Sequence, residues 1–201
     1  MDSPSLDAFD LTARARAAYG PDGRLALPKV AHWPICPFEV DSLAVRPLND
    51  PVLPETPRHG EDPGECHACR APDGDFLWTD DRWRVGMPEG PMALPNVWLH
   101  SRQHLDFEGL TDELAAEMGV RMAWIQRALS GIGGVRRVHL HRWGDGGAHL
   151  HALLVARPDG MMQLRGMFLM TWLHALPPLP AAVWDAMREH VARSLRSNPP
   201  G

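Results

Sequence analysis

Three cysteines occur in the 201-residue chain, and two of them, Cys66 and Cys69, form a CxxC motif. A two-residue spacer in a tight turn brings both thiolates to one point, which suits a tetrahedral metal ion. The motif supplies half of a four-ligand site, so two of the eleven histidines must complete it. We select His104, which follows a predicted strand, and His149, on the last predicted strand. The sequence therefore predicts a structural Zn²⁺ bound by these four residues.

Two other interpretations of the CxxC motif are a pair of ordinary cysteines and a redox dithiol. A redox CxxC normally opens a helix directly after a strand. Here the motif lies between Pro63-Gly64 and Ala71-Pro72-Asp73-Gly74, which are loop-forming sequences. The flanking residues therefore favour a metal site.

Two His-x-His pairs form a second group of candidate residues. His149-Leu150-His151 alternates along a predicted strand, so both imidazoles point to one face. His139-Leu140-His141 alternates on the strand before it. A hairpin turn at 144–147 would bring His141 near His149. The same pairing would bring His139 near His151, whereas a one-residue slip would turn the first pair toward solvent or the helix layer.

The elements that must position these residues follow from the hydrophobic pattern. Thr111-Asp112-Glu113 offers a capped helix start, and the helical spacing of apolar residues ends at Gly131. Short apolar runs bounded by turn residues predict strands. These strands cover 76–79, 83–87, 94–100, 135–143 and 148–156, and a last helix runs from about 180 through 191. This order predicts an α+β domain over 63–201, with an antiparallel sheet of about five strands, one long helix and a C-terminal helix.

Residues 1–62 differ from the rest of the chain because prolines recur at 28, 34, 37, 47, 51, 54 and 57. Proline lacks an amide donor and fixes φ, so extended segments are favoured over a packed layer. A short helix is predicted over 11–19. Interspersed apolar residues such as Trp33 and Phe38 would be unnecessary in a free linker. We therefore expect this proline-rich arm to lie on the domain or on a second subunit.

Composition limits the class of partner. The chain is 44% hydrophobic and 22% charged, with a net charge of −5, as in a folded globular protein. A mildly acidic chain has no general attraction to nucleic acid or to an anionic membrane, so an anionic ligand must be held locally. The apolar stretches are too short to cross a bilayer, and no secretion signal opens the chain. We expect a cytoplasmic protein.

From Cys66 to Arg157, about half of the chain, the sequence resembles the zinc-bearing branch of the histidine-triad (HIT) superfamily. That branch runs from CxxC through a hairpin, a strand that ends in a basic-polar segment plus His, and a helix. It ends in a strand with the pattern His-x-His-x-His-x-x-x-Arg. Ser101-Arg102-Gln103-His104 fits the segment after the third strand. On the last strand, His149, His151 and Arg157 fall in register with the first histidine, the middle histidine and the arginine.

The resemblance implies a nucleotide hydrolase or nucleotidyltransferase with a structural zinc. His151 would attack the α-phosphorus of a nucleotide or nucleoside-phosphate conjugate, forming a covalent intermediate that water or a second substrate resolves. His149 would be the metal ligand, as in the zinc-bearing branch. Amides at Gly146 and Gly147 would receive phosphate oxygens, with Arg142 as a counter-charge. Members of the superfamily are often homodimers, so a homodimer is expected.

Further substrate contacts are expected beyond the last strand. Gln163 and Arg165 alternate there and would reach back to a phosphate, together with Arg157. The alternative for Arg165 is a surface charge. Trp78 and Trp83 flank the first predicted turn, where the resemblance implies a base pocket, and one of them is a candidate to stack on a nucleobase. The alternative for both is the core, which most of the tryptophans are expected to fill.

Leu153 stands where the family pattern has its third histidine. Leucine neither donates nor accepts a proton, and loss of a positioned acid–base group costs about 10²–10⁴-fold in rate. Either His139 substitutes, or the leaving group needs no acid, or catalysis has been lost. Three functions therefore stand. They are an enzyme that forms a nucleotidyl-histidine, a zinc-stapled module that binds a nucleotide or a partner without turnover, and a hydrolase whose extra histidines hold a catalytic metal.

Overall fold

The computed structural model describes residues 7–197 and 199. The chain divides into two compact units, Met1–Thr56 and Pro57–Gly201. The division falls before Arg58 and His59, within the segment that the sequence assigned to the arm. These two residues belong to the second unit because the His59 carbonyl accepts a hydrogen bond from the Ala148 amide at 3.1 Å, and Arg58 pairs with Asp106.

The first unit contains one α-helix among its described residues, α1 (Ala8–Ala17). The Asp7 carboxylate caps it by accepting a hydrogen bond from the Asp10 amide at 2.8 Å, so the helix begins three residues before the predicted start. Two 3-10 turns and extended chain follow. The Tyr19 hydroxyl accepts a hydrogen bond from the Leu48 amide at 3.0 Å. The extended arm is as predicted, whereas its contact with the domain or a second subunit, and the homodimer, stay predictions.

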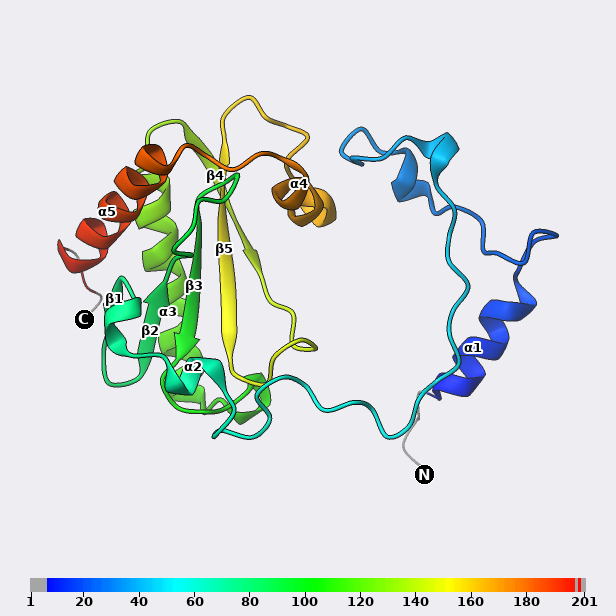
Figure 1. The fold of residues 1–201 in the computed structure, drawn as a ribbon, viewed down its shortest axis with the longest axis horizontal. Coiled ribbons are helices and arrows are strands. Elements are labelled where there is room, and N and C mark those ends of the chain that lie inside the picture. Colours follow the sequence, from blue (N-terminus) through cyan, green and yellow to red (C-terminus); the bar gives the residue numbers. More distant parts are fainter. Residues whose placement is uncertain (1–6, 198, 200–201) are drawn as a thin grey trace. The chain divides into compact units, whose positions relative to one another are not determined.

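The second unit is built on a five-stranded antiparallel sheet (Figure 1). The strand order is β1-β2-β3-β5-β4, so the last strand in the sequence lies inside the sheet and β4 forms an edge. The strands are β1 (Trp78–Thr79), β2 (Trp83–Gly86), β3 (Asn96–Ser101), β4 (Val135–His141) and β5 (His151–Pro158). The predicted α+β class is confirmed.

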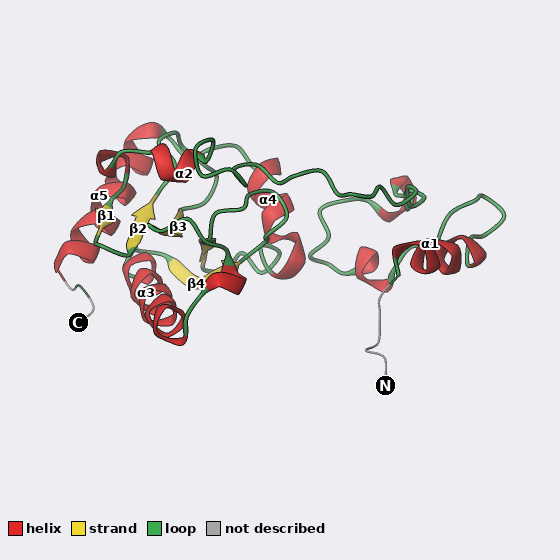
Figure 2. Cartoon of the chain, turned by 90° about the horizontal axis from the view of Figure 1, so that it is seen from below, coloured by secondary structure: helices red, strands yellow, loops and turns green. Residues whose placement is uncertain are grey.

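Two helices cover one face of the sheet. The long helix α3 (Asp112–Ser130) starts at Thr111, whose Oγ1 accepts a hydrogen bond from the Leu114 amide at 3.2 Å. Figure 2 shows α3 beside the strands. The C-terminal helix α5 (Ala181–Ser197) packs with α3 over a core that includes Leu154 of β5. No helix in the described part of the chain is both long enough and apolar enough to span a membrane.

The other face of the sheet carries a smaller apolar cluster. Leu153 and Val155 of β5 are 2% and 0% exposed there and pack with Leu169 and Leu173. The latter two come from α4 (Leu169–Ala175), which the sequence analysis did not predict. Because side chains alternate along a strand, His151 and Arg157 share this face with Leu153 and Val155.

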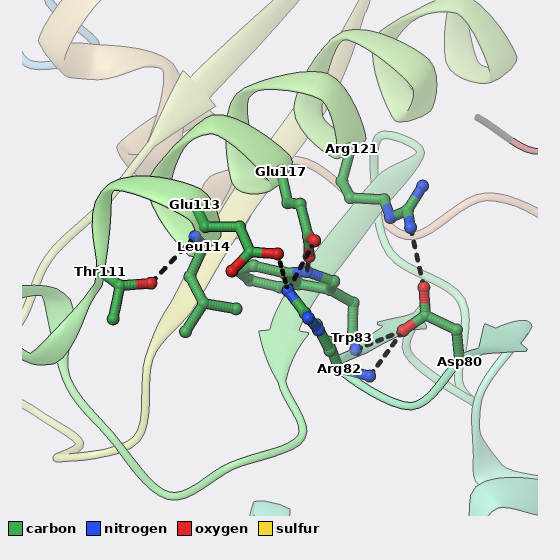
Figure 3. Close-up of polar contacts among 8 residues, drawn as sticks. All are labelled: Asp80, Arg82, Trp83, Thr111, Glu113, Leu114, Glu117 and Arg121. Carbon is green, nitrogen blue, oxygen red and sulfur yellow. Dashed lines mark hydrogen bonds and ion pairs between the residues drawn. The ribbon is translucent and has the colours of Figure 1, made fainter. Parts of the chain in front are cut away.

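Asp80 fixes the turn between β1 and β2 to α3 (Figure 3). Its carboxylate accepts hydrogen bonds from the amides of Arg82 at 2.8 Å and Trp83 at 2.6 Å, and from the Arg121 guanidinium at 2.9 Å. The Trp83 indole N–H donates to Glu117 at 2.9 Å. The hairpin is therefore held in place on the helix, and β2 in turn positions its neighbour β3.

Candidate metal centre and histidine site

The structure brings together the four residues that the sequence predicted as metal ligands. Cys66 is the N-cap residue of the four-residue helix α2 (His67–Arg70), and Cys69 lies within this helix. His104 follows β3, and His149 lies two residues before β5. The sulfur and imidazole nitrogen atoms all lie within 4.8 Å of one another. Residues from three distant parts of the chain thus offer four ligand atoms around one point.

The spacing of the ligand atoms fits a tetrahedral ion. Cys66 Sγ lies 3.4 Å from His149 Nδ1, and Cys69 Sγ lies 3.3 Å from His104 Nδ1 and 3.5 Å from His149 Nδ1. In a zinc tetrahedron, bonds of about 2.3 Å to sulfur and about 2.0–2.1 Å to nitrogen put neighbouring ligand atoms about 3.5 Å apart. The donor set of two sulfurs and two nitrogens also matches zinc chemistry.

Hydrogen bonding fixes how His149 presents its ring. Its Nε2 lies 2.7 Å from the Ser101 carbonyl oxygen, so Nε2 carries the proton and Nδ1 keeps the lone pair that faces the cysteines. Burial lowers the pKa of His149, and burial together with the neighbouring Cys66 raises the pKa of the Cys69 thiol to about 11. A bound cation would favour the thiolate and offset that shift.

Among the described residues, this is the one group of three or more His, Cys, Asp or Glu side chains that could hold a metal. His139 and His141 belong to no such group. This gives no support to a second, catalytic metal site built from the extra histidines.

His151, the first residue of β5, is half-buried and has one ring nitrogen fixed by a backbone hydrogen bond. Its Nδ1 lies 2.7 Å from the His149 carbonyl oxygen, so Nδ1–H donates and Nε2 keeps a free lone pair. A Cβ built on Gly147 would lie 3.8 Å from His151 Cε1, which shows how closely the loop backbone approaches the ring. The backbone carbonyl of His149, a predicted metal ligand, therefore orients the imidazole of His151.

Two aromatic neighbours of His151, Trp98 and His100, were not selected in the sequence analysis. The Trp98 ring lies 5.5 Å from that of His151 and 6.2 Å from that of His100. Trp98, His100 and Phe76 line a cavity of about 210 Å³. Burial, followed by the charges of the neighbouring histidines, lowers the pKa of His100 to about 3, so its ring is neutral. The sequence does contain a pattern that could have identified these residues. Asn96, Trp98 and His100 alternate along one predicted strand and therefore share a face of it.

The two tryptophans proposed for base stacking belong to the core instead. Trp83 is fully buried, and Trp78 meets the Trp124 ring edge-on at 4.8 Å. Of the two alternatives for Trp78 and Trp83, the core is therefore correct, because the hairpin turns both indoles toward α3. Trp98 on β3 lines the cavity instead.

The predicted pairing of the two His-x-His segments is wrong by several residues. His139 pairs with Val155, and His141 pairs with Leu153, so neither lies opposite His149 or His151. The cause is the connection between the strands. β4 ends at His141 and β5 begins at His151, so the turn is much longer than 144–147. Directly paired residues share a face, so His141 lies beside the position where the family pattern has a third histidine.

The loop between β4 and β5 holds the other predicted phosphate contacts. The Ala148 amide donates to the His59 carbonyl, which leaves Gly146 and Gly147 as the glycines of the predicted anion-binding turn. Arg142 pairs with Asp106 and lies over the Phe107 ring at 4.9 Å. Its charge therefore already has a partner in the protein.

The structure separates Arg157 and Arg165 from His151. Arg157 lies six residues further along β5, about 20 Å away at about 3.3 Å per residue. Gln163 and Arg165 are exposed in the segment after the strand. Arg157 and Arg165 line a different cavity. His151 does not line that cavity, and the predicted substrate contacts of Arg157, Gln163 and Arg165 stay predictions.

The solved structures to which the chain is similar include histidine triad proteins. A histidine triad protein from Bradyrhizobium japonicum is 17% identical over 59% of this chain and 88% of that chain, with a TM-score of 0.49. A zinc-bound histidine triad family protein from Mycobacterium smegmatis is 17% identical over 67% and 99%, with a TM-score of 0.48. A uridylyltransferase is 19% identical over 67% of this chain and 46% of that chain, with a TM-score of 0.46. Neither a protein-family model nor a curated protein matches the chain.

Proposed function

We propose that the chain is a zinc-stapled nucleotide hydrolase or nucleotidyltransferase in which His151 attacks an α-phosphate. The observation that carries this proposal is the 2.7 Å hydrogen bond from His151 Nδ1 to the His149 carbonyl. It fixes the tautomer that leaves Nε2 unprotonated, on a ring whose centre lies 5.5 Å from that of Trp98. A neutral, oriented imidazole of this kind is a competent nucleophile toward phosphorus.

Zinc would be held by Cys66, Cys69, His104 and His149, whose spacing and donor atoms fit it. Four protein ligands leave no open position for water or substrate, so the ion would supply structure rather than Lewis acidity. It would fix the segment that ends in His149, whose carbonyl orients His151. The metal ligand set thereby supports the proposed nucleophile through the backbone.

The reaction follows from the free lone pair of His151. Nε2 attacks the α-phosphorus, a P–N bond forms, and the bond from phosphorus to the leaving-group oxygen breaks with its electron pair on that oxygen. Water or an acceptor hydroxyl then attacks phosphorus, loses its proton, and releases the imidazole. The loop backbone at Gly147 lies beside the His151 ring, and the amides of Gly146 and Gly147 are suited to receive phosphate oxygens. The 210 Å³ cavity with Trp98 and Phe76 is suited to a planar base.

The leaving group takes up a proton unless it is already stable as an anion. Leu153 provides none, and His139 lies opposite Val155, too far along the sheet for the role that the sequence suggested. We assign that role to His141, which lies opposite Leu153 and whose Nε2 is buried without a hydrogen-bond partner among the described residues. A nitrogen with no protein partner can serve a ligand oxygen.

The test is to trap the intermediate on the full-length, zinc-loaded chain. We expect α-³²P-labelled ATP to leave label on the wild type in an acid-labile, base-stable form, as a phosphoramidate does, and no label on His151→Asn. His139→Asn is the matched control and should be labelled like the wild type. The zinc content and unfolding temperature of His151→Asn should match the wild type, which separates lost chemistry from lost fold. Label that persists on His151→Asn would contradict the proposal.

A second candidate is a nucleotide-binding module without turnover, which the buried, apolar Leu153 favours. It predicts that nucleoside monophosphates quench Trp98 fluorescence while no label is trapped on the wild type. Trp98→Phe should remove the quenching in that case. Labelling of the wild type that depends on His151 would exclude this candidate.

A further inference from the structure

A pocket of about 440 Å³ lies at the far end of β4 and β5 from His151. Its polar lining consists of four arginines, one histidine and one aspartate: Arg136, Arg137, Arg157, Arg165, His139 and Asp159. We call it the arginine pocket. Leu153 and Val155 are buried on the strand face between His151 and Arg157, so an apolar wall separates the pocket from the proposed nucleophile.

The four arginines of the pocket have no carboxylate partner. None of them forms an ion pair in the described part of the chain. The single aspartate, Asp159, accepts a hydrogen bond from the Gly160 amide at 2.9 Å. With His139 neutral, four arginines and one aspartate leave three uncompensated positive charges. This concentration occurs in a chain whose net charge is −5.

Arg157 is the residue whose environment most requires an anion. It is 5% exposed, and the hydrogen bonds described for it, to the carbonyls of Pro158 and Met161 at 3.1 and 3.2 Å, both come from one nitrogen, Nη1. A buried charge without a counter-charge is unfavourable. Burial and the Arg157 charge also lower the pKa of His139, so the positive field reaches its neighbour in the pocket.

The pairing of β4 with β5 adds a second, independent observation. Arg137 lies directly opposite Arg157 in the antiparallel register. Like charges directly opposite each other destabilise a strand pair. His139, two residues from Arg137, has a buried Nε2 without a hydrogen-bond partner among the described residues. An anion between the two guanidinium groups would relieve the repulsion and supply acceptors.

We propose that the arginine pocket is a second ligand site, separate from His151, that binds the diphosphate group of a small phosphorylated molecule. Guanidinium groups bind phosphate oxygens in bidentate fashion. One phosphate group carries about −1.5 to −2 charges at pH 7, so two linked groups match the pocket's three uncompensated charges better than one. The proposal does not depend on the activity assigned to His151.

The test is titration calorimetry of the full-length, zinc-loaded chain with inorganic pyrophosphate. We expect one saturable site that weakens with added NaCl, and phosphate that binds at least about tenfold more weakly because it leaves guanidinium groups unpaired. Arg137→Gln should weaken pyrophosphate by about tenfold or more. The matched control is Arg127→Gln, which removes an equal, exposed charge from α3 and should change nothing. His151→Asn should bind pyrophosphate like the wild type.

Thermal unfolding gives an independent readout of the same site. Without an anion, Arg137→Gln should unfold at a higher temperature than the wild type, because it removes the repulsion with Arg157. Pyrophosphate at a fixed concentration should raise the unfolding temperature of the wild type more than that of Arg137→Gln.

Four results would overturn the proposal. They are no pyrophosphate binding by the wild type, equal binding of phosphate and pyrophosphate, equal weakening by Arg127→Gln and Arg137→Gln, or loss of binding in His151→Asn. A short RNA without a terminal phosphate that displaces pyrophosphate at lower concentration would assign the pocket to a nucleic-acid backbone and would also overturn it.

Discussion

The two His-x-His pairs have the same sequence pattern on neighbouring strands, yet their environments differ. His149 and His151, at the start of the interior strand β5, each place one ring nitrogen 2.7 Å from a backbone carbonyl oxygen. His139 and His141, on the edge strand β4, each have a buried Nε2 without a hydrogen-bond partner among the described residues. The first pair has a fixed tautomer and the second does not.

This difference shows that strand alternation sets the face of a histidine but not its chemistry. An interior strand has a neighbouring strand on each side, and the backbone of that neighbour can hold an imidazole ring in place. The Ser101 carbonyl at the end of β3 does this for His149. An edge strand has a neighbour on one side only. We therefore expect substitutions of His149 and His151 to reduce metal binding and turnover. We expect His139 and His141 either to act on a ligand or to be dispensable.

The largest expected effect comes from the metal ligand of the first pair. His149→Ala should lose the zinc and at least about 5 kcal/mol of stability, since structural zinc contributes about 10–16 kcal/mol of binding free energy that enters folding. His139→Ala, the matched change on β4, should keep the zinc. Metal analysis and chemical unfolding measure both. Cys66→Ser should behave like His149→Ala, whereas Cys36→Ser, in the other unit, should not. Stoichiometric zinc in His149→Ala would show that the two pairs do not differ in this way.

The next effect separates the two histidines of β4. His141→Ala should lower turnover of a nucleoside phosphate ester of a simple alcohol by about 10²-fold, the lower end of what a positioned acid contributes. With a p-nitrophenyl ester, whose leaving group is stable as an anion, the loss should vanish. His139→Ala should leave both rates unchanged. Equal losses with both esters would mean that His141 supports the fold rather than protonating a leaving group.

A third change asks whether β5 still accepts a histidine at its third alternating position. Leu153 is 2% exposed in the cluster with Leu169 and Leu173, so Leu153→His should cost about 1–3 kcal/mol by burying a polar ring without a partner. Leu153→Met, of similar volume, should cost less than about 1.5 kcal/mol. Urea unfolding measures the difference. A Leu153→His variant as stable as the wild type would show that His141 or a neighbour already satisfies a ring at this place.

The sequence predicted much of the fold and the cluster of Cys66, Cys69, His104 and His149, because both depend largely on local patterns. Helix α3 was predicted over 111–131 and spans Asp112–Ser130. Cys66 and Cys69 were identifiable because spacing and loop context suffice for a half-site. The strand register was not predictable. The amides of Ala148 and Leu150 bond to the carbonyls of His59 and Leu105, outside the strand pair. These long-range contacts lengthen the turn and move His141 opposite Leu153, and no local pattern records them.

The smallest expected effect is a pH dependence that belongs to the β4 pair. Burial, followed by the Arg157 charge, lowers the pKa of His139 below its usual value of about 6.5. The unfolded chain therefore takes up a proton first as the pH falls, and the stability that this neutral histidine confers above pH 6.5 is lost below it. His139→Asn cannot be protonated, so its unfolding temperature should fall less than that of the wild type between pH 7 and about 5.5.

Arg137 and Arg165 also line the pocket around His139, with Asp159 as the single carboxylate. Occupation of the arginine pocket by pyrophosphate should shrink the difference between the two proteins, because an anion favours the protonated ring. A difference that pyrophosphate leaves unchanged would mean that the pocket charge does not act on His139, and that burial alone lowers its pKa.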